Sequence, residues 1–101
     1  MGDRRGEGAA LHSLGVALLE QSQLARALEK LQLALKIFQE VESQSEEAQT
    51  LADLSVLYWE LEDKQAAIDY CNCAYVLAKK LDLSLADECQ ELRQQILESQ
   101  S

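Results

Sequence analysis

The sequence contains no proline, and its glycines are nearly confined to the start: three of the four lie within residues 1–8. Proline ends or kinks helices, so a chain without it can form long uninterrupted helices. Nearly half of the residues are apolar (48%), which is enough for a compact helical body. At 101 residues the chain is predicted to form one domain, residues 1–101, that buries about 65% of the unfolded chain's surface.

Long apolar runs and basic residues are also scarce. No apolar run approaches roughly 18 residues and no signal-peptide pattern opens the chain, so we expect no membrane insertion. Nine Lys and Arg stand against 18 Asp and Glu, which gives a formal charge of −9. Such a charge repels nucleic acid and favours neutral or basic protein partners. The three cysteines, an odd number, fit a reducing compartment; we expect a cytoplasmic protein, and a nuclear one fits the same signal.

Residues that could support catalysis are nearly absent. His12 is the only histidine, and no Ser or Cys is placed to partner it. On a helix, Cys71 and Cys73 point about 200° apart and cannot readily share a metal ion. Neither of the glycine-rich phosphate-binding patterns occurs. We therefore predict no enzyme, no cofactor and no metal site; the enzymatic alternative, a thiol hydrolase on Cys73, lacks an accompanying base.

What the sequence does contain is a repeated pair of helices. From Leu51 to Leu81, apolar residues recur at spacings of three and four, which predicts two helices joined by the turn Glu62-Asp63-Lys64. The pattern recurs 40 residues earlier. The matching positions are Leu11, Leu14, Gly15, Leu18, Ala27, Leu28, Leu31, Ala34 and Leu35 in the first copy and Leu51, Leu54, Ser55, Tyr58, Ala67, Ile68, Cys71, Ala74 and Tyr75 in the second. Repetition of a helix pair predicts a solenoid.

Five small or apolar positions recur twice in one register: Leu14, Gly15, Leu18, Ala27 and Ala34, then Leu54, Ser55, Tyr58, Ala67 and Ala74. In this pattern, residues 8–81 resemble the tetratricopeptide repeat family. Two departures are clear. Gln39 and Lys79 stand where the family usually has proline, and the period is 40 rather than about 34. The longer period resembles repeats of spindle-orientation scaffolds, kinesin light chains and receptor-clustering proteins.

We predict an all-α fold: a right-handed α-solenoid of two helix-turn-helix repeats, about 7–42 and 44–81, with a capping helix at about 84–99. The expected helices run from Glu7 to Gln21, from Leu24 to Glu42, from about Gln44, from Asp63 as N-cap to about Leu81, and from Ser84 to about Glu98. Ser43 with Glu46, and Ser84 with Asp87, have capping-box spacing. The second and third helices could instead be fused through a kink. Because residues 2–7 fall in the frame of the inter-repeat connector, we expect a chain excised from a longer array.

In tetratricopeptide arrays, the first helix of each repeat lines a concave groove that binds partners. By register, the resemblance assigns to this groove Ala9, His12, Val16, Leu19, Glu20, Gln49, Ala52, Val56, Trp59 and Glu60. The Lys and Asn with which some members clamp acidic chaperone termini are absent from the corresponding places. Both first helices are apolar on two faces, so the second face is either bound by a partner or covered by a neighbour.

We therefore expect a protein–protein interaction module, part of a scaffold or adaptor, that binds an apolar peptide or helix, with or without a basic flank. Trp59 is its expected anchor, because Tyr58 packs inward and adjacent helical positions diverge by about 100°. Glu20 and Glu60 would attract a basic flank. The alternative is a structural repeat segment without a ligand, whose apolar faces bury against neighbouring repeats or which self-associates with a second copy through exposed repeat ends.

Overall fold

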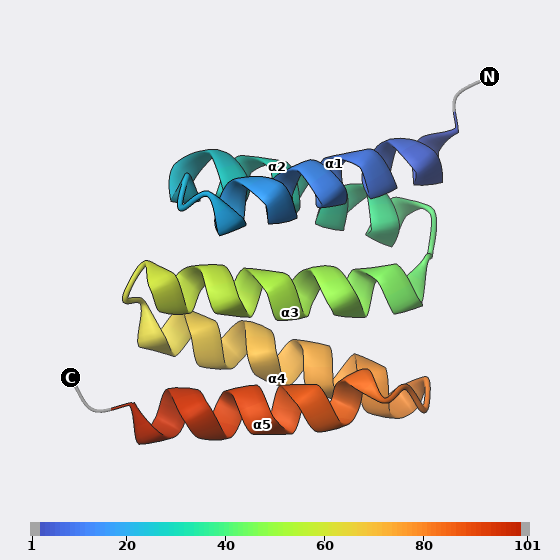
Figure 1. Ribbon diagram of the computed structural model, residues 1–101. Coiled ribbons are helices and arrows are strands. Elements are labelled where there is room, and N and C mark those ends of the chain that lie inside the picture. The colour runs from blue at the N-terminus through green and yellow to red at the C-terminus, as the bar shows by residue number, and fades with distance from the viewer. Residues whose placement is uncertain (1–2, 100–101) are drawn as a thin grey trace.

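The computed structural model describes residues 3–99, which form five α-helices and no strand. The helices are α1 (Arg4–Glu20), α2 (Leu24–Glu40), α3 (Gln44–Glu60), α4 (Lys64–Lys80) and α5 (Leu85–Glu98). Each helix runs antiparallel to the one before it and packs against it, so the chain forms a slab of 48 × 32 × 17 Å (Figure 1). The predicted all-α helical solenoid is confirmed.

A unit of 20 residues explains the 40-residue period. The helices α1 to α4 each have 17 residues. The three connections between them have three residues each. The second residue of every connection adopts a left-handed conformation: Ser22 (φ 61°), Glu42 (φ 56°), Glu62 (φ 64°) and Asp82 (φ 58°). The next N–H then bonds back into the helix, as from Gln23 to the Leu18 carbonyl at 2.9 Å. This capping motif ends each of the helices α1 to α4 without proline or glycine.

The structure corrects several predicted boundaries. Helix α1 begins at Arg4, three residues before the predicted start at Glu7, because the Asp3 side chain accepts a hydrogen bond from the Gly6 N–H at 2.9 Å. Helix α2 ends at Glu40, and the left-handed Glu42 separates it from α3, so the fused-helix alternative is wrong. Lys64, expected in the turn, is the first residue of α4.

The two predicted capping boxes do not form. The Ser43 hydroxyl donates to the Glu46 carboxylate and caps no backbone N–H of α3. Ser84 lies in a helical conformation itself and makes no side-chain cap to α5. Asp63, in contrast, accepts from the Ala66 N–H at 3.1 Å, which confirms it as the N-cap of α4.

Small residues let the two helices of each repeat cross closely. A Cβ atom on Gly15 would lie 2.7 Å from the side chain of Leu31, so no larger residue fits there without displacement. In the second repeat, Ser55 is fully buried and its hydroxyl donates to the Ala67 carbonyl at 2.6 Å. Small or tightly packed residues thus lie at both predicted crossings.

One predicted core residue is exposed. Leu14 has an exposed fraction of 45%, whereas Leu54, at the same place in the second repeat, is fully buried. The reason is that α2 packs against α3 from the preceding repeat, while no helix within residues 3–99 packs against α1 in the same way. Leu33 on α2 is also 44% exposed. The end of the solenoid formed by α1 and α2 therefore keeps an apolar surface.

Candidate partner-binding groove

The odd-numbered helices α1, α3 and α5 lie next to one another along one side of the slab, with α3 contacting both of the others. Two hollows follow this side. One, of about 260 Å³, lies between α1 and α3 and is lined by Ala9, His12, Ser13, Phe38, Glu46 and Gln49. The other, of about 230 Å³, lies between α3 and α5 and is lined by Gln49, Ala52, Asp53, Val56, Leu85, Glu88, Cys89 and Leu92. Gln49 borders both, so the hollows adjoin across α3.

The ten residues assigned by register fall into three groups. Five of them line the two adjoining hollows: Ala9, His12, Gln49, Ala52 and Val56. Trp59 and Glu60 line a separate hollow of about 310 Å³ at the end of α3. The structure does not bring the other three into a hollow: Val16 and Leu19 are half-buried against the core, and Glu20 is exposed.

A side-chain contact between a histidine and an aspartate crosses the groove between α1 and α3. His12 Nε2 lies 2.6 Å from Asp53 Oδ2, and the His12 ring meets Phe38 edge-on at a centroid distance of 6.5 Å. Gln49 donates to the other carboxylate oxygen of Asp53 at 3.3 Å. The sequence-based assignment omitted Asp53, although it is only one place removed from Ala52 in the groove register. Asp53 therefore connects the two repeats across the groove.

Basic residues at the start of α1 are already paired. The Arg5 guanidinium lies 2.5 Å from Glu46, and Arg4 contacts both Glu7 and Glu40 at 2.9 Å. The Ser43 hydroxyl, and then the Arg5 guanidinium, hold the pKa of Glu46 below its usual value. These cations are therefore balanced by neighbouring carboxylates and do not offset the charge further along the groove.

Further carboxylates border the groove side beyond these pairs. On helix α3, Asp53 and Glu60 line hollows of this side, and the helix has no Lys or Arg. Helix α5 carries four carboxylates and a single basic residue, Arg93, whose Nε donates to Asn72 of α4 at 2.9 Å. Arg93 thus contacts α4 and not the groove, and Glu88 lines the hollow between α3 and α5.

The two adjacent aromatic residues of α3 point in different directions. Tyr58 packs against the core and stacks on Tyr70, with ring centroids 5.1 Å apart and planes 13° from parallel. Gln32 donates to the Tyr70 hydroxyl at 3.1 Å. Trp59 does not belong to this core cluster; it is half-buried and borders its hollow together with Glu60. Tyr58 therefore packs inward as expected, and the role of Trp59 as an anchor stays a prediction.

The arrangement of two repeated helical hairpins agrees with a comparison against protein families, in which the tetratricopeptide repeat matches residues 6–80. The chain belongs to the tetratricopeptide repeat family. Helix α5 lies outside the matched residues. No curated protein and no solved structure matched the chain. Tetratricopeptide repeats are non-catalytic modules that mediate protein–protein interaction.

The three thiols of this tetratricopeptide domain differ in burial and in surroundings. Cys71 and Cys89 are buried, and burial raises the pKa of both, that of Cys89 to about 11. Cys73 is exposed, but the imidazole of His12 is paired with Asp53 in a different hollow and provides no base for it. Within residues 3–99, no three His, Cys, Asp or Glu residues gather into a possible metal site, and no helix has the length and apolar character needed to cross a membrane.

Proposed function

We propose that this tetratricopeptide domain binds an apolar peptide or helix with a basic flank in the groove formed by α1, α3 and α5. The observation that carries the proposal is the segregation of charge. Each of the three hollows on this side has a carboxylate in its lining, whereas the basic residues at the start of α1 are paired and Arg93 contacts α4. Apolar lining such as Val56 and Leu92 then provides contact area for an apolar segment between the charges.

Trp59 is the proposed anchor of the partner. A half-buried indole beside a carboxylate offers a large apolar contact and a neighbouring attraction for a Lys or Arg of the partner. Aromatic residues of this kind carry a large part of the binding energy at interfaces, commonly about 2 kcal/mol or more each. Glu20 and Glu60 lie at the ends of α1 and α3 and would attract the basic flank.

The proposal is tested with a helical peptide of roughly 16 residues, a length at which isolated helices begin to be stable, that carries a Leu stripe flanked by Lys. We expect Trp59→Ala to weaken its binding about tenfold or more and to change the melting temperature little. Leu97→Ala on α5, which removes an exposed Leu outside the groove, is the matched control and should bind as the parent does. A large loss of stability with unchanged affinity would make Trp59 a core residue and remove the anchor.

The exposed Leu14 favours a second candidate function. In that case the domain is a structural repeat segment whose end face, with Leu14 and Leu33, buries against another repeat or a second copy. Sedimentation at micromolar concentration separates the two candidates. A monomer that binds the Lys-flanked peptide supports the first, and a self-associating species that does not bind it supports the second.

A further inference from the structure

A second groove lies on the outer side of α4, away from the one just described. It has a volume of about 530 Å³ and shares no lining residue with the two adjoining hollows. Helices α2, α3 and α4 all contribute to it, and its lining consists of Gln39, Glu47, Leu51, Asn72, Cys73, Val76, Leu77 and Lys80. Its volume falls within the range of about 300–1,000 Å³ that is typical of ligand sites.

Folding does not account for Val76, one of the apolar residues that line this outer groove. Val76 is 64% exposed, so it buries little surface in the core. The same place in the first repeat holds Lys36, which shows that the repeat does not require an apolar side chain there. An exposed apolar side chain that adjoins Leu51 and Leu77 in a hollow is the arrangement expected where a partner's apolar residues bind.

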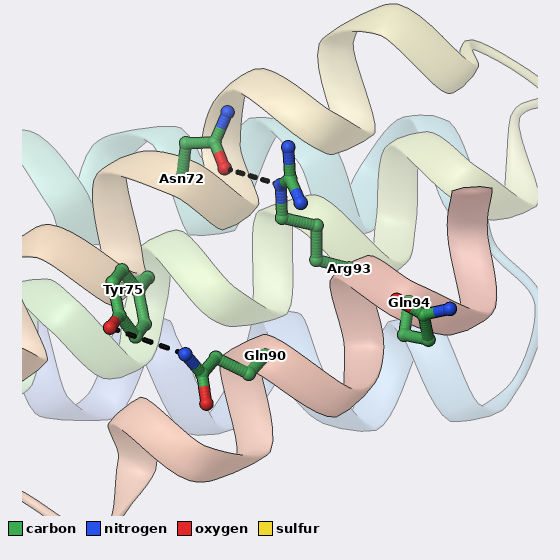
Figure 2. A pocket seen from close by; sticks show the side chains of 5 residues that line it. All are labelled: Asn72, Tyr75, Gln90, Arg93 and Gln94. Atoms are coloured by element: carbon green, nitrogen blue, oxygen red, sulfur yellow. Dashed lines mark hydrogen bonds between the residues drawn. The ribbon is translucent and has the colours of Figure 1, made fainter.

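Two cations bracket these apolar residues. Lys80 lines the groove at the end of α4, and Arg93 lies near Asn72, to which its Nε donates at 2.9 Å. Asn72 also borders a polar pocket of about 470 Å³ between α4 and α5, where the terminal nitrogens of Arg93 extend beyond the hydrogen bond (Figure 2). Within residues 3–99, neither Arg93 nor Lys80 forms an ion pair.

Three residues of this region form a regular stripe along α4. Asn72, Val76 and Lys80 are four residues apart in turn, so they lie on one face of the helix and span about 12 Å along its axis. The one carboxylate of the groove, Glu47, is half-buried and accepts a hydrogen bond from Gln39 at 3.3 Å. The stripe therefore has a cation near each end, Lys80 and, through Asn72, Arg93, while Glu47 keeps its charge because the Gln39 amide is neutral.

We propose that this outer groove binds an amphipathic helix of a partner protein whose apolar stripe is bracketed by carboxylates about two turns apart. The apolar stripe would cover Val76 and Leu77, one carboxylate would reach Lys80, and the other would reach the free guanidinium nitrogens of Arg93. Charged groups at this spacing fix the register of the partner helix, while the apolar contact excludes water between them. The domain then has two binding faces of opposite charge preference.

The test uses two helical peptides of roughly 16 residues with the same Leu stripe, one with Glu two turns apart beside the stripe and one with Lys at those places. Binding is measured by fluorescence anisotropy. We expect the Glu peptide to bind at least tenfold more tightly to the Val76 face than the Lys peptide does. Val76→Asp and Lys80→Glu should each weaken binding of the Glu peptide at least tenfold, whereas Leu97→Asp should leave it unchanged.

Cys73 provides a second readout. It is the exposed thiol of the three and lines the outer groove, so a bound helix should slow its reaction with a small thiol reagent several-fold. The proposal is overturned if Val76→Asp leaves Glu-peptide binding unchanged, or if the bound peptide does not protect Cys73. It is also overturned if the parent protein sediments as a dimer that Val76→Asp dissociates, because a second copy would then occupy the groove. Should Val76→Asp fail to fold, Lys80→Glu and the Cys73 protection decide the outcome.

Discussion

The two repeats offer a direct measurement of what a covering helix contributes, because Leu14 and Leu54 stand at the same place in them. Leu54 is fully buried and Leu14 is 45% exposed. Replacing a fully buried Leu by Ala removes its transfer free energy and leaves a cavity, at a cost of about 3–5 kcal/mol. At Leu14 roughly half of the transfer term is missing and no closed cavity forms, so we expect Leu14→Ala to cost about 1 kcal/mol or less.

These costs are large enough to separate the two variants clearly. A small domain has a free energy of unfolding of about 5–15 kcal/mol, so Leu54→Ala removes a substantial part of it. With a urea dependence of about 1.5 kcal/mol per molar, its unfolding midpoint should fall by about 2 M or more. The midpoint of Leu14→Ala should fall by well under 1 M on the same estimate.

Equal losses in the two variants would refute this reasoning. They would mean that Leu14 is covered in solution by something that residues 3–99 do not provide. Repeating the Leu14→Ala measurement at several protein concentrations identifies the covering partner. A loss that grows with concentration points to a second copy of the chain, because only the associated species would bury Leu14.

Two further predictions concern the crossing and the buried thiols. Gly15→Leu should destabilise the protein by about 3 kcal/mol or more, because the new Leu side chain would enter the space of the facing helix. Ser55→Ala should cost about 1 kcal/mol. Urea unfolding of both variants measures the two losses, and a Gly15→Leu protein as stable as the parent contradicts the prediction. Stability should fall between about pH 9 and pH 11: burial raises the pKa of Cys89 to about 11, so its contribution is complete below the ordinary thiol value near 9 and is lost as the pH rises through 11. Cys89→Ala should reduce this alkaline loss by up to about 2–3 kcal/mol, Cys73→Ala should not, and identical pH profiles for the two variants would contradict the assignment.

The repeated apolar pattern predicted the fold because packing and sequence agree at most places. The stripes of α2 and α4 are buried at Leu31 and Cys71, and the small residues at Gly15 and Ser55 mark the helix crossings. The turn geometry was not predictable, since left-handed residues without glycine carry no strong sequence signal. The exposure of Leu14 depends on a neighbouring helix and not on its own residue type.

The candidate groove was only partly predictable for a related reason. Register places a residue on a helix face, but it does not say whether a neighbouring helix is near enough to form a hollow. Ala52 and Val56 therefore line a hollow that α5 closes on one side. Val16 of α1, in contrast, packs against the core and lines no hollow. The outer groove depends on side chains from three helices, and one of its apolar residues, Val76, departs from the repeat pattern.

The order of the helices in the slab has a consequence for how the chain folds. Contacts join almost entirely helices that follow one another in sequence, with only slight contact between alternate ones. Each contact therefore closes a short loop of chain, and the loss of chain entropy before the first favourable contact is small. Such local topologies fold rapidly, and a hairpin formed at either end can act as the template on which the next helix docks.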